Sequence, residues 1–87
     1  MKYEFFSLAE IEATEMADPY IFTKHPEALE AATECIHQCL AKSQRSYDMA
    51  ANALPGSPFN VVGTKRAQES IEEYNRWLKN HPLPSKK

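Results

Sequence analysis

The residue types best suited to metal chemistry gather in the stretch Cys35-x-His37-x-Cys39. Thiolates and imidazoles are the usual ligands of zinc. On a helix, however, His37 would lie about 160° from the midpoint of the two cysteines, so one ion cannot take all three ligands from one chain. We therefore predict no metal site and interpret Cys35 and Cys39 as free, buried thiols.

Catalysis by a thiol would need a neighbouring base, and neither cysteine has an obvious one in the sequence. The carboxylates fall on helix faces that we expect to be in solvent, where they lack the buried setting that general acid–base catalysis uses. These carboxylates are Glu10, Glu12, Glu15, Glu69, Glu72 and Glu73. The sequence predicts a protein that is not an enzyme and that has no cofactor.

The run from Gly63 to Arg66 has residue types that favour the binding of an anion. Thr64 is predicted to cap a helix there, and the free amides and dipole of a helix start favour negative charge. The glycine spacing of a phosphate-binding loop is missing, so an ordinary capped helix is the simpler interpretation. The candidate anion-binding residues, the last two from a neighbouring subunit, are Thr64, Lys65, Arg66, Lys42 and Arg45.

Charge is divided unevenly along the chain, although the total is only −2. Residues 1–34 carry eight acids and two lysines, while residues 35–87 carry four acids and eight lysines or arginines. We expect Lys42 and Arg45 to form ion pairs with acids of a neighbouring helix. Since no aromatic residues alternate with these cations, nucleic-acid binding is only a third alternative.

Three helices are predicted from caps and breakers. Ser7 and Glu10 form a capping box for a helix ending near Ala17, before Asp18-Pro19. A long helix runs from residues 24–26 to Leu54, and a third covers residues 64–79. Residues 20–22 are interpreted as a core-filling loop, and residues 55–63 as a second loop.

The long helix carries an apolar stripe beside a row of small residues. The stripe consists of Leu29, Ile36, Leu40, Tyr47 and Leu54. The small residues would let a second helix approach closely. We predict an all-α fold, a helical hairpin of one long and one shorter helix with a short N-terminal helix packed across it, in one domain (residues 1–82) followed by a flexible basic tail (83–87).

The long helix has more apolar and small surface than one short partner helix can cover, which predicts self-association as a dimer or larger assembly. Trp77 is expected at a partly exposed flank, and tryptophan often anchors interfaces. The candidate interface residues are Trp77, Ala28, Cys35, Cys39 and Ala53.

The leading hypothesis for function is a non-enzymatic interaction protein that binds a protein partner and blocks or regulates it. Phages and other mobile elements carry many small proteins of this general kind, without active sites, that inhibit host defence. The likeness is general, and no motif in this sequence identifies a family. The main alternative is an oligomeric sink for a small anionic ligand such as a nucleotide. No apolar run approaches the roughly 20 residues of a membrane span and no signal peptide is seen, so we expect a cytoplasmic protein.

Overall fold

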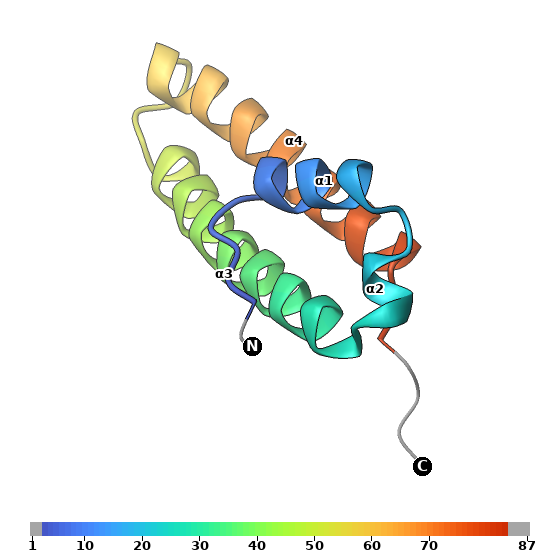
Figure 1. Cartoon of the computed structure of the whole chain (residues 1–87). Helices are drawn as coiled ribbons and strands as arrows, with labels where there is room; N and C mark the ends of the chain where they lie inside the picture. The colour runs from blue at the N-terminus through green and yellow to red at the C-terminus, as the bar shows by residue number, and fades with distance from the viewer. Residues whose placement is uncertain (1–2, 84–87) are drawn as a thin grey trace.

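The computed structural model describes residues 3–83, and this part of the chain folds into four helices with no strand. They are α1 (Leu8–Ala17), α2 (Ile21–Lys24), α3 (Pro26–Ala51) and α4 (Pro58–Asn80). α3 and α4 form an antiparallel hairpin, α1 lies across it, and α2 sits near its open end (Figure 1). The predicted all-α hairpin with a short N-terminal helix across it is confirmed. Of the predicted tail, residues 84–87 lie outside the described part.

α1 begins and ends where its sequence predicts. The Ser7 hydroxyl accepts a hydrogen bond from the Glu10 amide at 3.3 Å. The Glu10 carboxylate reaches one residue further back than in an ordinary capping box and accepts from the Phe6 amide at 2.8 Å. The helix ends at Ala17 because Asp18 takes an extended conformation, as a residue before proline prefers.

The segment after α1 forms a single helical turn, α2, where a loop was predicted. Its bonds include that from the His25 amide to the Ile21 carbonyl, at 2.8 Å. Ile21 is buried and Phe22 is half-buried, so the segment fills the core as expected. A turn this short contains too few residues to show a helical period, which is why sequence patterning missed it.

The connection between the long helices lies elsewhere than predicted, since α3 ends at Ala51 and α4 starts at Pro58. The Ser57 hydroxyl accepts from the Asn60 amide at 3.2 Å, and Pro58 occupies the first turn, where its missing amide hydrogen costs nothing. The predicted ends, Leu54 and a cap at Thr64, are therefore wrong. Ser57-Pro58 was the true start signal.

The two ends of the hairpin are built differently, and we call residues 3–39 and 71–83 the base and residues 40–70 the tip. The base holds one core formed by α1, α3 and α4. Its buried members are Leu8, Ile11, Leu29, Ala32, Cys35, Ile36 and Trp77. The predicted stripe is thus buried at Leu29 and Ile36.

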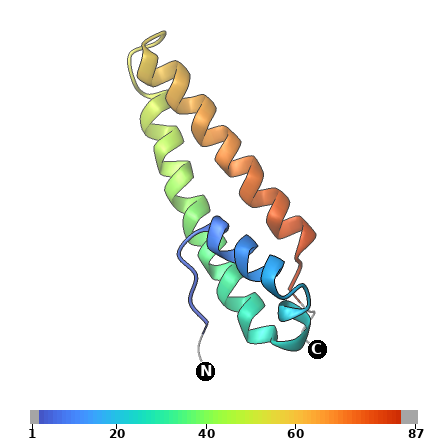
Figure 2. The ribbon, with the colours of Figure 1, turned by 45° about the horizontal axis from the view of Figure 1, so that its top comes forward.

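In the tip, Ala50 and Ala67 are the buried side chains. A Cβ atom added at Gly63 would lie 2.8 Å from the Cβ of Ala50, so the two helices meet almost backbone to backbone. They lie close together here and diverge toward the base, where α1 and α2 fill the gap (Figure 2). Leu54 lies beyond α3 and is 77% exposed, so the predicted stripe does not continue to it.

Candidate functional site

The main candidate site is the open part of the trough between α3 and α4. At the base this trough is covered by α1, whose Leu8 and Ile11 belong to the same core as Trp77. Beyond α1 the trough stays open as a groove of about 520 Å³. It is lined by Ser43, Ser46, Gly63, Arg66, Ala67, Glu69, Ser70 and Glu73. In Figure 1 α1 lies nearest the viewer and the tip recedes, so this face of the molecule forms a step.

Helical spacing explains why these side chains share one face. On α4, Gly63, Arg66 and Ser70 follow one another at three- and four-residue intervals, and the same series reaches Phe59 before them and Trp77 after them. The buried base and the open groove therefore use one stripe of α4. On α3, Ser46 lies on a stripe with Lys42 and Met49 by the same rule.

The tip exposes several large apolar side chains, as the base does at Phe6, Met16 and Tyr20. Met49 is 64% exposed and Phe59 is 56% exposed. Three more exposed apolar residues belong to the tip, namely Leu54, Val61 and Val62. None of these five side chains lines the groove. Single exposed apolar residues are common, but several in one part of a small protein are typical of a surface that binds another molecule.

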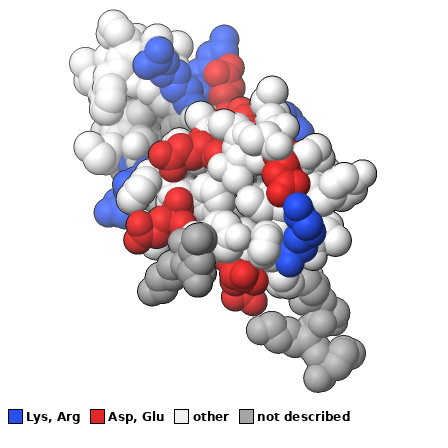
Figure 3. All heavy atoms as spheres, viewed as in Figure 1, with Lys and Arg blue, Asp and Glu red and all other residues white. Residues whose placement is uncertain are grey.

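Charge also separates the two ends. The tip carries four lysines or arginines against Asp48 and Glu69, whereas the base carries ten acids against three lysines or arginines. No ion pair within the described residues includes any of the tip cations, Lys42, Arg45, Lys65 and Arg66. In Figure 3 the acids gather over the base, and blue side chains border the white surface of the tip. We call Lys42, Arg45, Ser46, Met49, Phe59 and Arg66 the tip surface.

The ion pairs that we expected across the hairpin are absent from the described part of the chain, so this expectation was wrong. Lys42 and Arg45 lie more than 4.0 Å from every acid described, including the carboxylates on α4. These cations therefore stay in contact with solvent.

α1 is fixed on the base by a contact between distant parts of the chain. Nε2 of His81 lies 3.1 and 3.0 Å from the two carboxylate oxygens of Glu15, and Nδ1 lies 2.9 Å from the Trp77 carbonyl. The imidazole stacks on the Trp77 indole at 4.2 Å, and Phe22 meets both rings edge-on. Since both ring nitrogens face acceptors, an imidazolium makes both hydrogen bonds at once.

The two thiols are free and packed, Cys35 buried and Cys39 half-buried. Burial, followed by the neighbouring Cys39 thiol, raises the pKa of Cys35 to about 11. Burial also raises the pKa of Tyr74, with Cys39 the next cause. Because a thiolate is the nucleophile and the metal ligand, Cys35 is poorly placed for either role at neutral pH. Between residues 3 and 83, no three metal-binding side chains come together.

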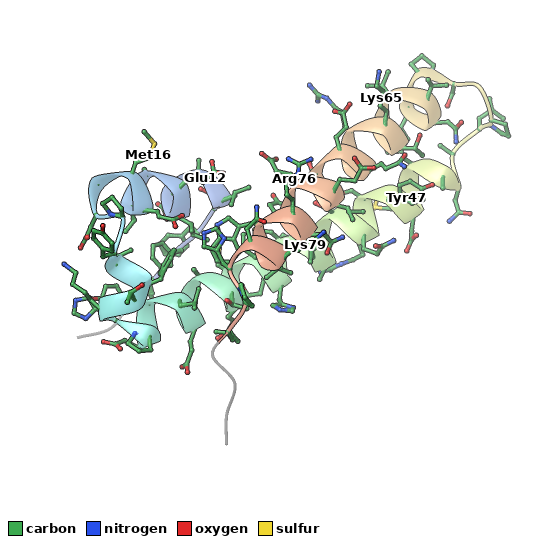
Figure 4. All side chains as sticks on the ribbon, turned by 90° about the vertical axis from the view of Figure 1, so that its right-hand side faces the viewer. Glu12, Met16, Tyr47, Lys65, Arg76 and Lys79 are labelled. Carbon is green, nitrogen blue, oxygen red and sulfur yellow. The ribbon has the colours of Figure 1, made fainter. Side chains whose placement is uncertain are left out.

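The predicted anion site does not have the geometry that motivated it. Thr64 lies inside α4, and its hydroxyl donates to the Asn60 carbonyl at 2.7 Å, so it is no helix cap. Arg66 lines the groove, while Lys65 points away from α3 (Figure 4). The helix-start argument for Thr64, Lys65 and Arg66 is therefore wrong.

The predicted interface residues are distributed over both ends. Trp77 is only 5% exposed, so the expected partial exposure is wrong: α1 and α2 cover this flank. Ala28 and Cys35 are buried, and Cys39 and Ala53 are half-buried. The small-residue row thus serves contacts within the chain. Sequence reasoning missed Met49 and Phe59 as surface residues, although Phe59 stands one helical turn before Gly63 on the same stripe.

No helix in the described part of the chain combines the length and apolar character that crossing a bilayer requires. Comparison of the chain with protein-family models, with curated proteins and with solved structures finds no match. The geometry of the tip is therefore the basis for a functional proposal.

Proposed function

We propose that this protein is a non-enzymatic interaction protein that docks on a protein partner through its tip surface. The observation that carries the proposal is the half-covered trough: α1 fills it at the base, while the tip part stays open, in the same part of the molecule that exposes Met49 and Phe59. Inhibitors and regulators that act by covering a partner's surface need no more than such a docking face.

The composition of the tip surface suits a protein partner. Arginine and aromatic residues contribute most to interface energies, and Arg66 lies two helical turns after Phe59 on one stripe of α4. The exposed apolar residues of the tip can be buried by a partner, and its four lysines or arginines against two acids favour an acidic partner. The raised pKa of Cys35 supports a role without covalent chemistry. We place this role in the cytosol, where free thiols persist.

A capture experiment with matched variants tests the proposal. The chain is immobilised as the wild type, as the double variant Phe59→Ala/Arg66→Glu, and as Lys79→Glu, a control that changes an exposed charge on α4 at the base. We expect a partner that the wild type and Lys79→Glu retain and the double variant loses. Titration of the purified partner should then show a dissociation constant at least about tenfold weaker for the double variant.

The proposal fails if every retained protein binds the double variant as well as the wild type. It also fails if the purified partner binds all three forms equally in the titration, because the tip surface would then have no part in recognition.

A small anionic ligand is the second candidate, and one observation favours it. Arg66 shares the groove with the hydroxyls of Ser43, Ser46 and Ser70. Glu69 and Glu73 line the same groove and oppose an anion. A panel of nucleotides in a thermal-shift assay tests this candidate, since a ligand at 100 times its dissociation constant adds about 2.7 kcal/mol. Equal melting curves with and without every nucleotide would eliminate it.

A further inference from the structure

We propose that a second groove, at the base between the N-terminal segment and α3, binds an organic cation through its alkylguanidinium group. We call it the base groove. It is separate from the tip surface, so the inference does not depend on the function proposed for the tip. It follows from the aromatic and acidic side chains that line this groove.

The base groove has a volume of about 410 Å³ and takes its walls from two segments of the chain. On α3, Ala31, Glu34 and Gln38 follow one another at three- and four-residue intervals and therefore share one face, with the buried Cys35 beside them. The other wall is formed by residues 3–6, which run beside α3 (Figures 1 and 2). The fold thus brings two parts of the base together around one hollow.

The N-terminal wall is held in place by contacts along its length. The Tyr3 ring lies 5.8 Å from the His25 imidazole, measured between ring centroids. Phe5 packs against the core of the base, and the Phe6 amide donates to the Glu10 carboxylate at 2.8 Å. Because this wall is ordered before a ligand arrives, binding does not have to pay for its ordering.

Aromatic rings distinguish the base groove from the tip groove. Tyr3, Phe5 and Phe6 line the base groove, whereas no aromatic residue lines the tip groove. Phe6 is 75% exposed, so its ring is accessible to a ligand. The face of an aromatic ring attracts a cation that lies within about 6 Å of its centre.

The charges that line the base groove also favour a cation. Glu4 and Glu34 belong to its walls, and no lysine or arginine of residues 3–83 does. Neither carboxylate takes part in an ion pair within this part of the chain. A cation in the groove would therefore meet carboxylates that are free to pair with it.

The Cys35 thiol in the wall supports the same sign of charge. After burial and the Cys39 thiol, the Glu10 carboxylate is the next cause that raises the pKa of Cys35, and it acts more strongly than Lys42, which lowers that pKa. Lys42 stands one helical turn beyond Gln38 and does not line the groove.

A guanidinium group suits this combination of side chains. It is planar and weakly hydrated, so it can lie on an aromatic ring while its N–H groups donate to a carboxylate. The side-chain carbonyl of Gln38 can accept a further hydrogen bond. The volume falls in the range of about 300–1,000 Å³ that is typical of small-ligand sites, which combine apolar walls with a few polar groups in the same way.

A titration of the isotope-labelled full chain with butylguanidinium, followed by NMR, tests the site. We expect the backbone amide signals of residues 3–6 and 31–38 to shift, with a dissociation constant of about 1 mM or tighter. Butylurea has the same shape without the charge and should bind about tenfold more weakly. Equal binding of butylurea, or no shift of these signals at about 10 mM butylguanidinium, overturns the inference.

Matched variants test which side chains bind the cation. Glu34→Gln and Phe6→Ala change exposed residues, so both should fold, and each should weaken binding at least about threefold. Glu30→Gln is the control, since Glu30 is exposed one turn earlier on α3 and does not line the groove. If neither variant weakens binding, or if the control weakens it equally, the cation binds by general charge attraction and the inference fails.

A capped peptide with one arginine among glycines identifies the source of the guanidinium group. Binding at least about tenfold tighter than that of butylguanidinium assigns the groove to an arginine on a protein partner, and equal binding assigns it to a free small cation. The tip double variant Phe59→Ala/Arg66→Glu should bind butylguanidinium as the wild type does. Failure at the base groove can therefore be told apart from failure of the proposed function at the tip.

Discussion

The base and the tip are both formed by α3 and α4. They differ in the side chains that lie between these two helices and in whether α1 and α2 cover them. At the base, large side chains hold α3 and α4 apart, and α1 and α2 cover the gap. At the tip, Ala50 and Gly63 bring the helices almost into backbone contact, and the apolar side chains that remain point outward. One hairpin therefore contains a core that is complete at one end and an open groove at the other.

This difference shows where a small helical protein can leave apolar side chains and a groove uncovered. A domain of about 90 residues buries only some 60–65% of the surface of its unfolded chain, so it has little apolar area to leave exposed. Concentrating the core at the base meets the need for stability. The tip, held by small residues in close contact, can expose Met49 and Phe59 with less cost to the fold.

The largest expected effect on stability comes from removing a large side chain from the core of the base. Trp77→Ala removes a buried indole that packs against Phe22 and His81, and should lower the free energy of unfolding by about 3–5 kcal/mol. Phe59→Ala, the matched change at the tip, should cost less than about 1 kcal/mol because that ring is more than half exposed. Urea unfolding measures both. If Trp77→Ala leaves too little folded protein, Trp77→Phe serves, and equal losses at the two ends would contradict the comparison.

The next effect probes the close helix contact at the tip. Gly63→Ala adds a methyl group 2.8 Å from the Ala50 Cβ, a clash whose cost of roughly 1–3 kcal/mol exceeds the gain of up to about 1 kcal/mol in helix propensity. Asn75→Ala, on the exposed side of α4, should change stability by less than about 0.5 kcal/mol.

A double-mutant cycle identifies the cause of the Gly63→Ala effect. Ala50→Gly removes the opposing methyl group, so the pair should be more stable than the sum of the single changes predicts. Strict additivity would mean that the helices are not in close contact here.

A smaller effect is expected from the contact that fixes α1 on the base. Glu15→Gln weakens a charge-assisted hydrogen bond to His81 and should cost about 1–1.5 kcal/mol, less than a fully buried bond because Glu15 is partly exposed. Glu12→Gln on the same helix is the control and should change stability by less than about 0.5 kcal/mol. Amide hydrogen exchange should quicken in α1 for Glu15→Gln alone. If amide hydrogen exchange in α1 is unchanged, the packing of Leu8 and Ile11 is enough to hold α1 on the base without this hydrogen bond.

The smallest effect is a pH dependence confined to alkaline solution. The pKa of Cys35 is raised to about 11 in the folded chain from its ordinary value of 9.0, so the folded chain binds more protons than the unfolded chain between these values. Stability is therefore constant below about pH 8 and falls as pH rises toward 11, by roughly 1 kcal/mol between pH 8 and pH 10. The raised pKa of Tyr74 acts in the same direction. Urea unfolding at several pH values tests this, and Cys35→Ala should flatten the fall.

Local chemistry made much of the fold predictable. The cap at Ser7, the break at Asp18-Pro19 and the proline at the start of α3 each act within a few residues, and the structure has all three where the sequence indicates them. The same kind of signal at Ser57-Pro58 was overlooked because Gly63 was taken as a breaker. Gly63 is instead an interior helical residue, required by the approach of Ala50 across the hairpin.

The candidate site was less predictable because it depends on what α1 leaves uncovered. A single stripe of α4 carries both Trp77 and Phe59, and no feature of that stripe says which end a third helix will cover. Trp77 was therefore expected at a partly exposed flank and lies in the core, while Phe59, on the same stripe, is 56% exposed.

The sequence by itself determined the three long helices in outline, the cap at Ser7, the small residues that allow close approach and the division of charge between the ends, since each arises from neighbours along the chain. Only the tertiary structure decided which half of the trough is filled and which residues stay in solvent. The physical reason is the length of α1: ten residues span about 15 Å, too short to cover a hairpin that extends to 48 Å in its longest dimension.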